Sequence, residues 1–346
     1  MSTTIPESPA RAPRPSSSRL PELRLLTPVA PAPAGSRFPW LVTAAHAWIL
    51  VGLFLDGWFH IHRGDNESFF TPWHAILYSG VAATVVVHLW EQRRAGGTQP
   101  GYAASLVGGL VVLAAGAVDG VWHTVFGVEA DLNALLSPPH LLLITAGTLV
   151  FAGPLRAALR APAGAAGGLP TAFAAAFVIT GLGFFTQYAN PFTQVFAAVA
   201  DTAAGVEAAE LREVAGVAGV IVWAALTAGA LAVLHARTPL VRGSLAVVVG
   251  VPSLAMTTQQ DTYAFVPAIV LAALLVELVG RRLSPAMTAA LATAALTTGW
   301  VVTVLLTRDV AWTRELLTGS VGSAAAAGYL VGWLAQNGGV REGSPA

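Results

Sequence analysis

The sequence predicts an all-α protein, a polytopic bundle of about ten transmembrane helices. Three observations indicate this fold class. Hydrophobic residues make up 55% of the 346 residues and charged residues only 10%, whereas about one quarter of a typical soluble domain is charged. Apolar runs of about 20 residues, the length that crosses a bilayer as a helix, recur along the chain. Arginine, which replaces lysine throughout, gathers in alternate connections between these runs.

The composition divides the chain into four regions. Residues 1–36 are rich in Pro, Ser, Ala and Arg and contain no apolar core, so we expect a disordered cytoplasmic tail. Residues 37–160 are expected to form a metal-binding four-helix unit, residues 161–336 further transmembrane helices, and residues 337–346 a second cytoplasmic tail. The predicted spans lie near 38–60, 73–91, 103–123, 139–158, 170–188, 213–235, 244–260, 263–280, 285–306 and 317–335.

The distribution of arginine predicts the orientation of the spans. With ten spans, 14 of the 18 Arg fall in the two tails and in the connections on the same side as the tails. Cytoplasmic connections of membrane proteins carry the excess of positive charge, so we expect an integral plasma membrane protein with both termini cytoplasmic. The composition excludes an ordinary soluble enzyme, a disordered protein and a nucleic-acid binder with a basic face. The absence of Cys excludes thiolate metal sites and disulfides.

Two segments share one pattern of metal-ligating residue types. In each, an Asp is followed four residues later by a His, then by a polar loop, a Ser/Thr-Pro pair and a second His. Each pattern starts at the end of an odd-numbered span and finishes at the start of the next. Spans one to four therefore look like a tandem repeat of two helical hairpins. The residues are Asp56, His60 and His74 in the first segment, and Asp119, His123 and His140 in the second.

Helix geometry is expected to bring the members of each pattern together. Residues four apart lie on one face of a helix, about one turn apart. Thr71 and Ser137 suit the N-cap position, and each precedes a proline that suits the first helical position. His74 and His140 then open the following helices, whose positive ends favour the neutral imidazole that binds metal. We expect two Asp/His/His sites on the extracellular side that hold Cu(II), zinc or non-haem iron; the alternative is hydrogen-bonded Asp–His pairs that only fix helix packing.

Polar residues also end two later spans on the same side of the membrane. Gln187 and Tyr188 follow the fifth span, and Gln259, Gln260 and Asp261 follow the seventh. We expect them either to form a polar pocket around the metal or only to cap helices at the membrane interface.

Other histidines and acids offer additional ligands. His62, Asp65 and Glu67 lie in or next to the first polar loop. His46 and His88 each lie 14 residues from a predicted ligand, on the same helix face and about 21 Å deeper. We expect His46 and His88 to form interhelical hydrogen bonds, or alternatively to relay protons or hold a further metal.

The first segment resembles a known family. Asp56-x3-His60, then Arg63 and Asp65, then Phe70-Thr71-Pro72-Trp73-His74 is similar to the copper-ligating third subunit of the copper membrane monooxygenases, the particulate methane and ammonia monooxygenases. The resemblance is local to residues 56–74, and its loop is one residue longer than in the family. It implies that Asp56, His60 and His74 are copper ligands and that the protein oxidises small apolar substrates or ammonia with dioxygen.

Three functions fit these features. The first is a copper-dependent membrane oxidase or monooxygenase acting on a small or hydrophobic substrate. The second is a zinc-dependent membrane lipid hydrolase, in which Asp119 or Asp261 serves as general base. The third is a metal transporter or accessory protein without enzymatic activity. The expected partners are the lipid bilayer and either other membrane subunits or further copies of this chain, but not nucleic acid.

Overall fold

The computed structural model describes Pro28 and residues 36–63, 70–127, 131–161, 168–198 and 205–338. This part of the chain is helical, and its only β-type pairings are two isolated bridges. Nearly all of the predicted N-terminal tail, residues 339–346 and the loop acids Asp65 and Glu67 lie outside the described residues.

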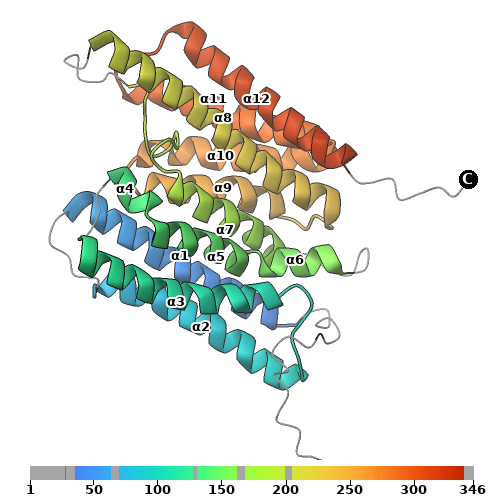
Figure 1. The fold of residues 1–346 in the computed structure, drawn as a ribbon. Coiled ribbons are helices and arrows are strands. Elements are labelled where there is room, and N and C mark those ends of the chain that lie inside the picture. The colour runs from blue at the N-terminus through green and yellow to red at the C-terminus, as the bar shows by residue number, and fades with distance from the viewer. Residues whose placement is uncertain are drawn as a thin grey trace, which may run out of the picture.

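The helices run side by side along one axis of the molecule (Figure 1). Every predicted span coincides with a helix or with a pair of helices. The helices are α1 (Phe38–Arg63), α2 (Pro72–Ala95), α3 (Ala103–Phe126), α4 (Asp131–Leu136), α5 (Pro138–Phe151), α6 (Gly153–Arg160), α7 (Leu169–Phe185), α8 (Gly205–Arg237), α9 (Ser244–Thr257), α10 (Val266–Val279), α11 (Pro285–Thr307) and α12 (Arg314–Asn337), with the 3-10 turns η3 (Tyr263–Phe265) and η4 (Gly280–Arg282) at the two ends of α10.

The chain is a helical membrane protein, but fewer helices than predicted have the length and apolarity of a full span. Within the described residues, six segments pass this test: α1, α2, α3, α8 from Glu207, α10 with its flanking turns, and α11. Helices α5 and α6 together would make a seventh, bent by 46°. Helices α7 and α9, with 17 and 14 residues, are shorter than the about 20 residues of a typical membrane-spanning helix.

Two local features explain why the predicted fourth and tenth spans differ from ordinary spans. Pro154 lies in the first turn of α6, and a proline removes one helical hydrogen bond and clashes with the preceding turn, so α5 ends and α6 sets off at an angle. Helix α12 packs through small residues. A Cβ atom at Gly332 would lie 2.6 Å from Cα of Ala286 in α11. The backbones of α11 and α12 are thus in close contact, which small residues allow and the large apolar side chains of an ordinary span would prevent.

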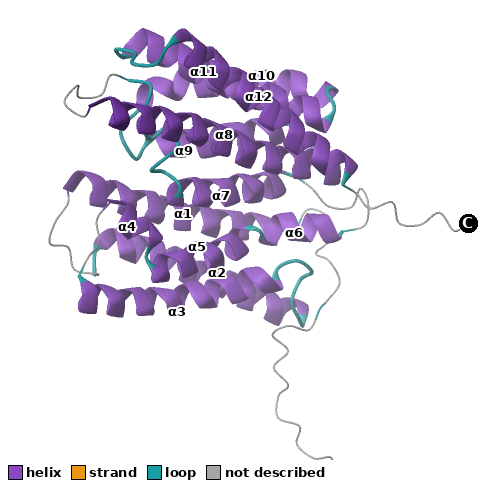
Figure 2. Ribbon diagram, turned by 45° about the horizontal axis from the view of Figure 1, so that its top comes forward, coloured by secondary structure: helices purple, strands orange, loops and turns teal. Residues whose placement is uncertain are grey.

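The arrangement separates two groups of helices (Figure 2). Helices α1, α2, α3 and α5 pack together, as do α8, α10, α11 and α12, and α7 joins the groups because it contacts α1, α5, α8 and α9. The chain enters α1 and leaves α12 at the same end of the bundle, opposite to the end that carries α4 (Figure 1). The C-terminal ends of α1 and α3 therefore lie at one end of the bundle.

Glu277 of α10 stabilises the start of α9. Its carboxylate accepts hydrogen bonds from the backbone N–H groups of Gly243 at 2.9 Å, Leu245 at 3.1 Å and Ala246 at 3.2 Å. The first N–H groups of a helix have no partner within the helix. Hydrogen bonds to a charged acceptor such as this carboxylate stabilise a fold by about 2 kcal/mol each.

We expect Glu277→Ala to lower the thermal unfolding temperature of the detergent-purified protein, because α9 loses these acceptors. Glu210→Ala, which removes an exposed carboxylate from α8, is the control and should leave the unfolding temperature within error of the parent. Equal shifts in the two variants would show that Glu277 does not cap α9.

Candidate metal centres

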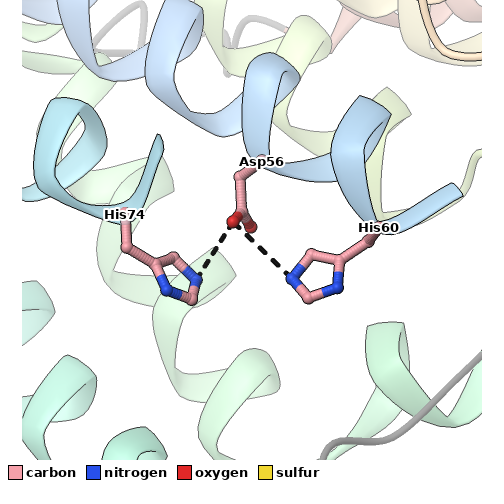
Figure 3. Close-up of side chains that lie close together, drawn as sticks. All are labelled: Asp56, His60 and His74. Carbon is pink, nitrogen blue, oxygen red and sulfur yellow. Dashed lines mark ion pairs between the residues drawn. The ribbon is translucent and has the colours of Figure 1, made fainter. Parts of the chain in front are cut away.

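The first centre joins the end of α1 to the start of α2. Asp56 and His60 are one turn apart on α1, and His74 lies in the first turn of α2 (Figure 3). Thr71 is the N-cap of α2, and its hydroxyl accepts a hydrogen bond from the backbone N–H of His74 at 3.2 Å. Oδ1 of Asp56 lies 3.6 Å from Nε2 of His60 and 3.1 Å from Nε2 of His74. The spacing of four residues in α1 and the N-cap of α2 thus bring the side chains of Asp56, His60 and His74 together.

The second centre joins α3 to α5 in the same way. Oδ2 of Asp119 lies 3.5 Å from Nε2 of His123 and 3.7 Å from Nε2 of His140. Ser137 occupies the predicted N-cap position of α5. Its hydroxyl makes no hydrogen bond to the helix backbone, however, and contacts Nδ1 of His140 at 2.8 Å instead. The hydroxyl of Ser137 therefore holds the imidazole of His140 in place and leaves the backbone N–H groups at the start of α5 uncapped by this side chain.

Each group could hold a metal ion. The three ligand atoms of each centre, one per residue, lie within 4.8 Å of one another. Oδ1 of Asp119 is buried and accepts no hydrogen bond from the described residues, whereas the imidazoles of His60 and His74 face Oδ1 of Asp56. A buried carboxylate oxygen without a donor is costly, and a bound cation removes that cost.

Hydrogen-bonding partners at the outer nitrogens orient the rings of the second centre. Nδ1 of His123 lies 3.3 Å from the carbonyl oxygen of Gly127, which can only accept. In the neutral ring the lone pair is then on Nε2, the atom that faces Asp119. A backbone carbonyl partner on the outer nitrogen is a usual support of a metal-ligating histidine. The contact of His123 with Gly127 therefore fits a group that could hold a metal ion.

Both centres open onto one cavity of about 1140 Å³. Tyr78, which was not predicted as a site residue, lines this cavity between the centres. It lies one turn after His74 on the same face of α2, and its hydroxyl lies against Gly116 of α3, where a Cβ atom would be 2.5 Å from the oxygen. The spacing of four residues from His74 was the pattern that could have identified it. Gln194 also lines the cavity and was not predicted.

The five predicted pocket residues do not all lie at the cavity. Gln187, Tyr188 and Gln260 line it. Gln259 is fully buried instead, and its side-chain amide donates to the carbonyl of Phe54 at 3.0 Å, so it ties the end of α9 to α1. Asp261 is not among the cavity residues; it accepts a hydrogen bond from Nε1 of Trp58 at 3.2 Å and lies 3.2 Å from Nε2 of His62.

The other histidines lie apart from the two centres. His62 stacks on Trp58 and faces Asp261. His46 is fully buried, and neither ring nitrogen has a hydrogen-bond partner in the described part of the chain. Nδ1 of His88 contacts the carbonyl oxygen of Thr84 in its own helix at 2.7 Å. The predicted interhelical hydrogen bonds of His46 and His88 are therefore not formed among the described residues; His46 packs edge-on against Phe151 instead, with ring centroids 5.5 Å apart.

The chain is thus a helical membrane protein with two Asp/His/His groups that could each hold a metal ion on a shared cavity. No protein-family model, no curated protein and no solved structure matches it.

Proposed function

We propose that this protein is a membrane metalloenzyme that binds copper at both centres and oxidises a hydrophobic substrate with dioxygen. The observation that carries this proposal is the opening of both Asp/His/His groups onto one largely apolar cavity. Two imidazoles and one carboxylate leave open coordination positions, which are a feature of catalytic rather than closed structural sites. A cavity shared by two such groups can bring one substrate to both.

The donor atoms fit copper. Imidazole suits copper, zinc and iron, and a set of two imidazoles and one carboxylate with open positions is compatible with Cu(II), as it is with zinc and non-haem iron. The similarity of Asp56, His60 and His74 to the copper ligands of the membrane monooxygenases supports copper over zinc. We therefore include distant kinship with the copper-ligating subunit of that family in the proposal. The match between the two hairpins supports an internal duplication as the origin of the second centre.

The residues of the chain have separate roles in this proposal. The histidines and aspartates hold the metal ions, and Gly127 and Ser137 orient the rings of the second centre. Bound copper would supply the one-electron chemistry that reduces dioxygen, with electrons from an external reductant such as a quinol. The apolar walls exclude water, and Tyr78, whose hydroxyl lies against Gly116 almost one turn before Asp119, adds a polar group to the cavity wall.

The concentration of arginine on one side supports an orientation with both termini in the cytoplasm. The shared end of the bundle at which α1 begins and α12 ends fits this orientation (Figure 1). The two centres then face the extracellular side of the plasma membrane.

A zinc-dependent lipid hydrolase is the second candidate, since an apolar cavity beside metal ligands also suits a lipid ester. Hydrolysis needs a general base next to the metal-bound water. Among the described residues, the acids that line the cavity are Asp56 and Asp119, and each belongs to a centre. Asp261, the other predicted base, lies at His62. This arrangement favours the oxidase over the hydrolase.

Elemental analysis and electron paramagnetic resonance of the purified protein test the proposal. We expect two copper ions per chain, a Cu(II) spectrum with nitrogen hyperfine structure, and oxygen consumption on addition of a quinol and a hydrophobic alcohol. Zinc alone with ester turnover would support the hydrolase, and a protein that binds neither metal after separate loading with copper and with zinc would overturn both candidates.

A further inference from the structure

The cavity is a long slot with both centres at one end. Its lining follows three helices for eleven residues inward from a metal-ligating histidine, which is about 16 Å at 1.5 Å per residue. The three stretches run from His60 to Ile49 in α1, from His123 to Val112 in α3, and from His140 to Phe151 in α5. Because the three helices give the same depth, the slot has a floor at one level.

The lining changes in character along the slot. The end at the centres carries the polar side chains, including Tyr78, Gln187 and Gln260. The deep end is lined by aliphatic side chains such as Val81 and Val150, and by glycines. The ring of Phe151 closes the floor, where it packs against His46 and Phe177. The volume of about 1140 Å³ exceeds that of most pockets for drug-sized ligands, which reach about 1,000 Å³.

We propose that the slot binds a single-chain amphiphile, with its oxygen-bearing head group at the two centres and its apolar tail reaching the floor. This inference rests on the proposed function because it assigns the substrate class of the same site. A small polar substrate would fill only the end at the centres and leave the deep apolar half empty. Large empty cavities are rare because protein interiors are closely packed, so the deep half is expected to hold an apolar chain. A primary alcohol or a fatty acid has the required shape and polarity.

Gly147 offers a way to shorten the slot without disturbing the helices. It lines the cavity two turns below His140, about 10 Å deep, and a Cβ atom there would have no neighbour within 4 Å. A phenylalanine at this position therefore projects into the slot. A Cβ atom at Gly322 of α12 would also have no neighbour within 4 Å, and no residue of α12 lines the cavity. Gly322→Phe is therefore the matched control.

The experiment measures displacement of a fluorescent polyene fatty acid from the purified protein in phosphatidylcholine nanodiscs. The competitors are n-alkyl alcohols from octanol to octadecanol at equal mole fraction in the bilayer, so that partition into the membrane does not favour longer chains. We expect displacement to be strongest near dodecanol, whose extended length is close to the depth of the slot, and at least about tenfold weaker for octanol and octadecanol. Gly147→Phe should move the optimum to octanol, and Gly322→Phe should leave it at dodecanol.

Three results would overturn the inference: no binding of the probe, equal displacement at every chain length, or the same optimum in Gly147→Phe as in the parent. Loss of probe binding as the phospholipid content rises would show that a diacyl bilayer lipid fills the slot, which also contradicts a single-chain ligand. Metal content is measured on samples of the same protein. A metal-free protein that keeps the dodecanol optimum would refute the proposed function but not the binding site, and a copper-loaded protein without a chain-length optimum would do the reverse.

Discussion

Asp56→Ala is expected to remove one of the two bound metal ions, and Asp119→Ala to remove the other. Each carboxylate is the only acid in its group, and without it two neutral imidazoles must hold a doubly charged ion alone. Loss of a supporting outer partner already lowers metal affinity by about 10–100-fold, so loss of a ligand should lower it by at least about 100-fold. Metal per chain, measured after dialysis against a weak chelator, should fall from two to one in each variant and to zero in the double variant.

Asp261→Ala is the control for these variants. Asp261 faces a histidine, as Asp56 and Asp119 do, but it lies outside both groups. Its removal should leave two metal ions per chain. Asp119→Asn keeps the shape of the buried side chain and loses its charge, so it should lose the metal while it keeps the unfolding temperature of the metal-free parent. Loss of both ions in Asp56→Ala alone would mean that the two groups share one metal cluster, contrary to separate centres.

The convergence of each Asp/His/His group could be predicted from the sequence because it depends on local geometry. The spacing of four residues between Asp56 and His60 fixes their shared face, and the Thr-Pro pair fixes where the next helix begins and where His74 points. Such relations need only the helix period and the helix start. The same two rules placed the second centre.

The cavity and the non-local partners could not be predicted in this way. Gln259 and Asp261 are neighbours in the sequence, yet one is buried against α1 and the other faces His62 at the surface. Asp261 adopts a left-handed backbone conformation, φ 51°, in the turn after α9, which the sequence does not indicate. Likewise, the position of Tyr78 beside the second centre depends on how α2 packs on α3, which composition and spacing do not determine.

The close contact between α1 and α2 sets the distance between the ligating residues of the first centre. A Cβ atom at Gly52 would collide with the backbone of Leu77, and a Cβ atom at Gly80 would lie 2.8 Å from the backbone nitrogen of Ile49. Two glycines that face a partner backbone allow helices in a membrane to approach closely. Gly52 precedes Asp56 by one turn, and Leu77 follows His74 by almost one turn. The distance between the metal ligands of the two helices therefore depends on this contact.

Gly52→Ala is expected to force α1 and α2 apart and to weaken metal binding at the first centre while the second centre keeps its ion. Overpacking of this kind costs about 1–3 kcal/mol, so the unfolding temperature should fall together with the metal content of the first centre. Gly250→Ala adds the same methyl group to another buried helical glycine, where the nearest neighbour, Cβ of Ala273, is an ordinary 3.5 Å away. That variant should keep both ions and the unfolding temperature. If the two variants behave alike, or if Gly52→Ala loses the ion of the second centre first, the approach of α1 to α2 does not set the geometry of the first centre.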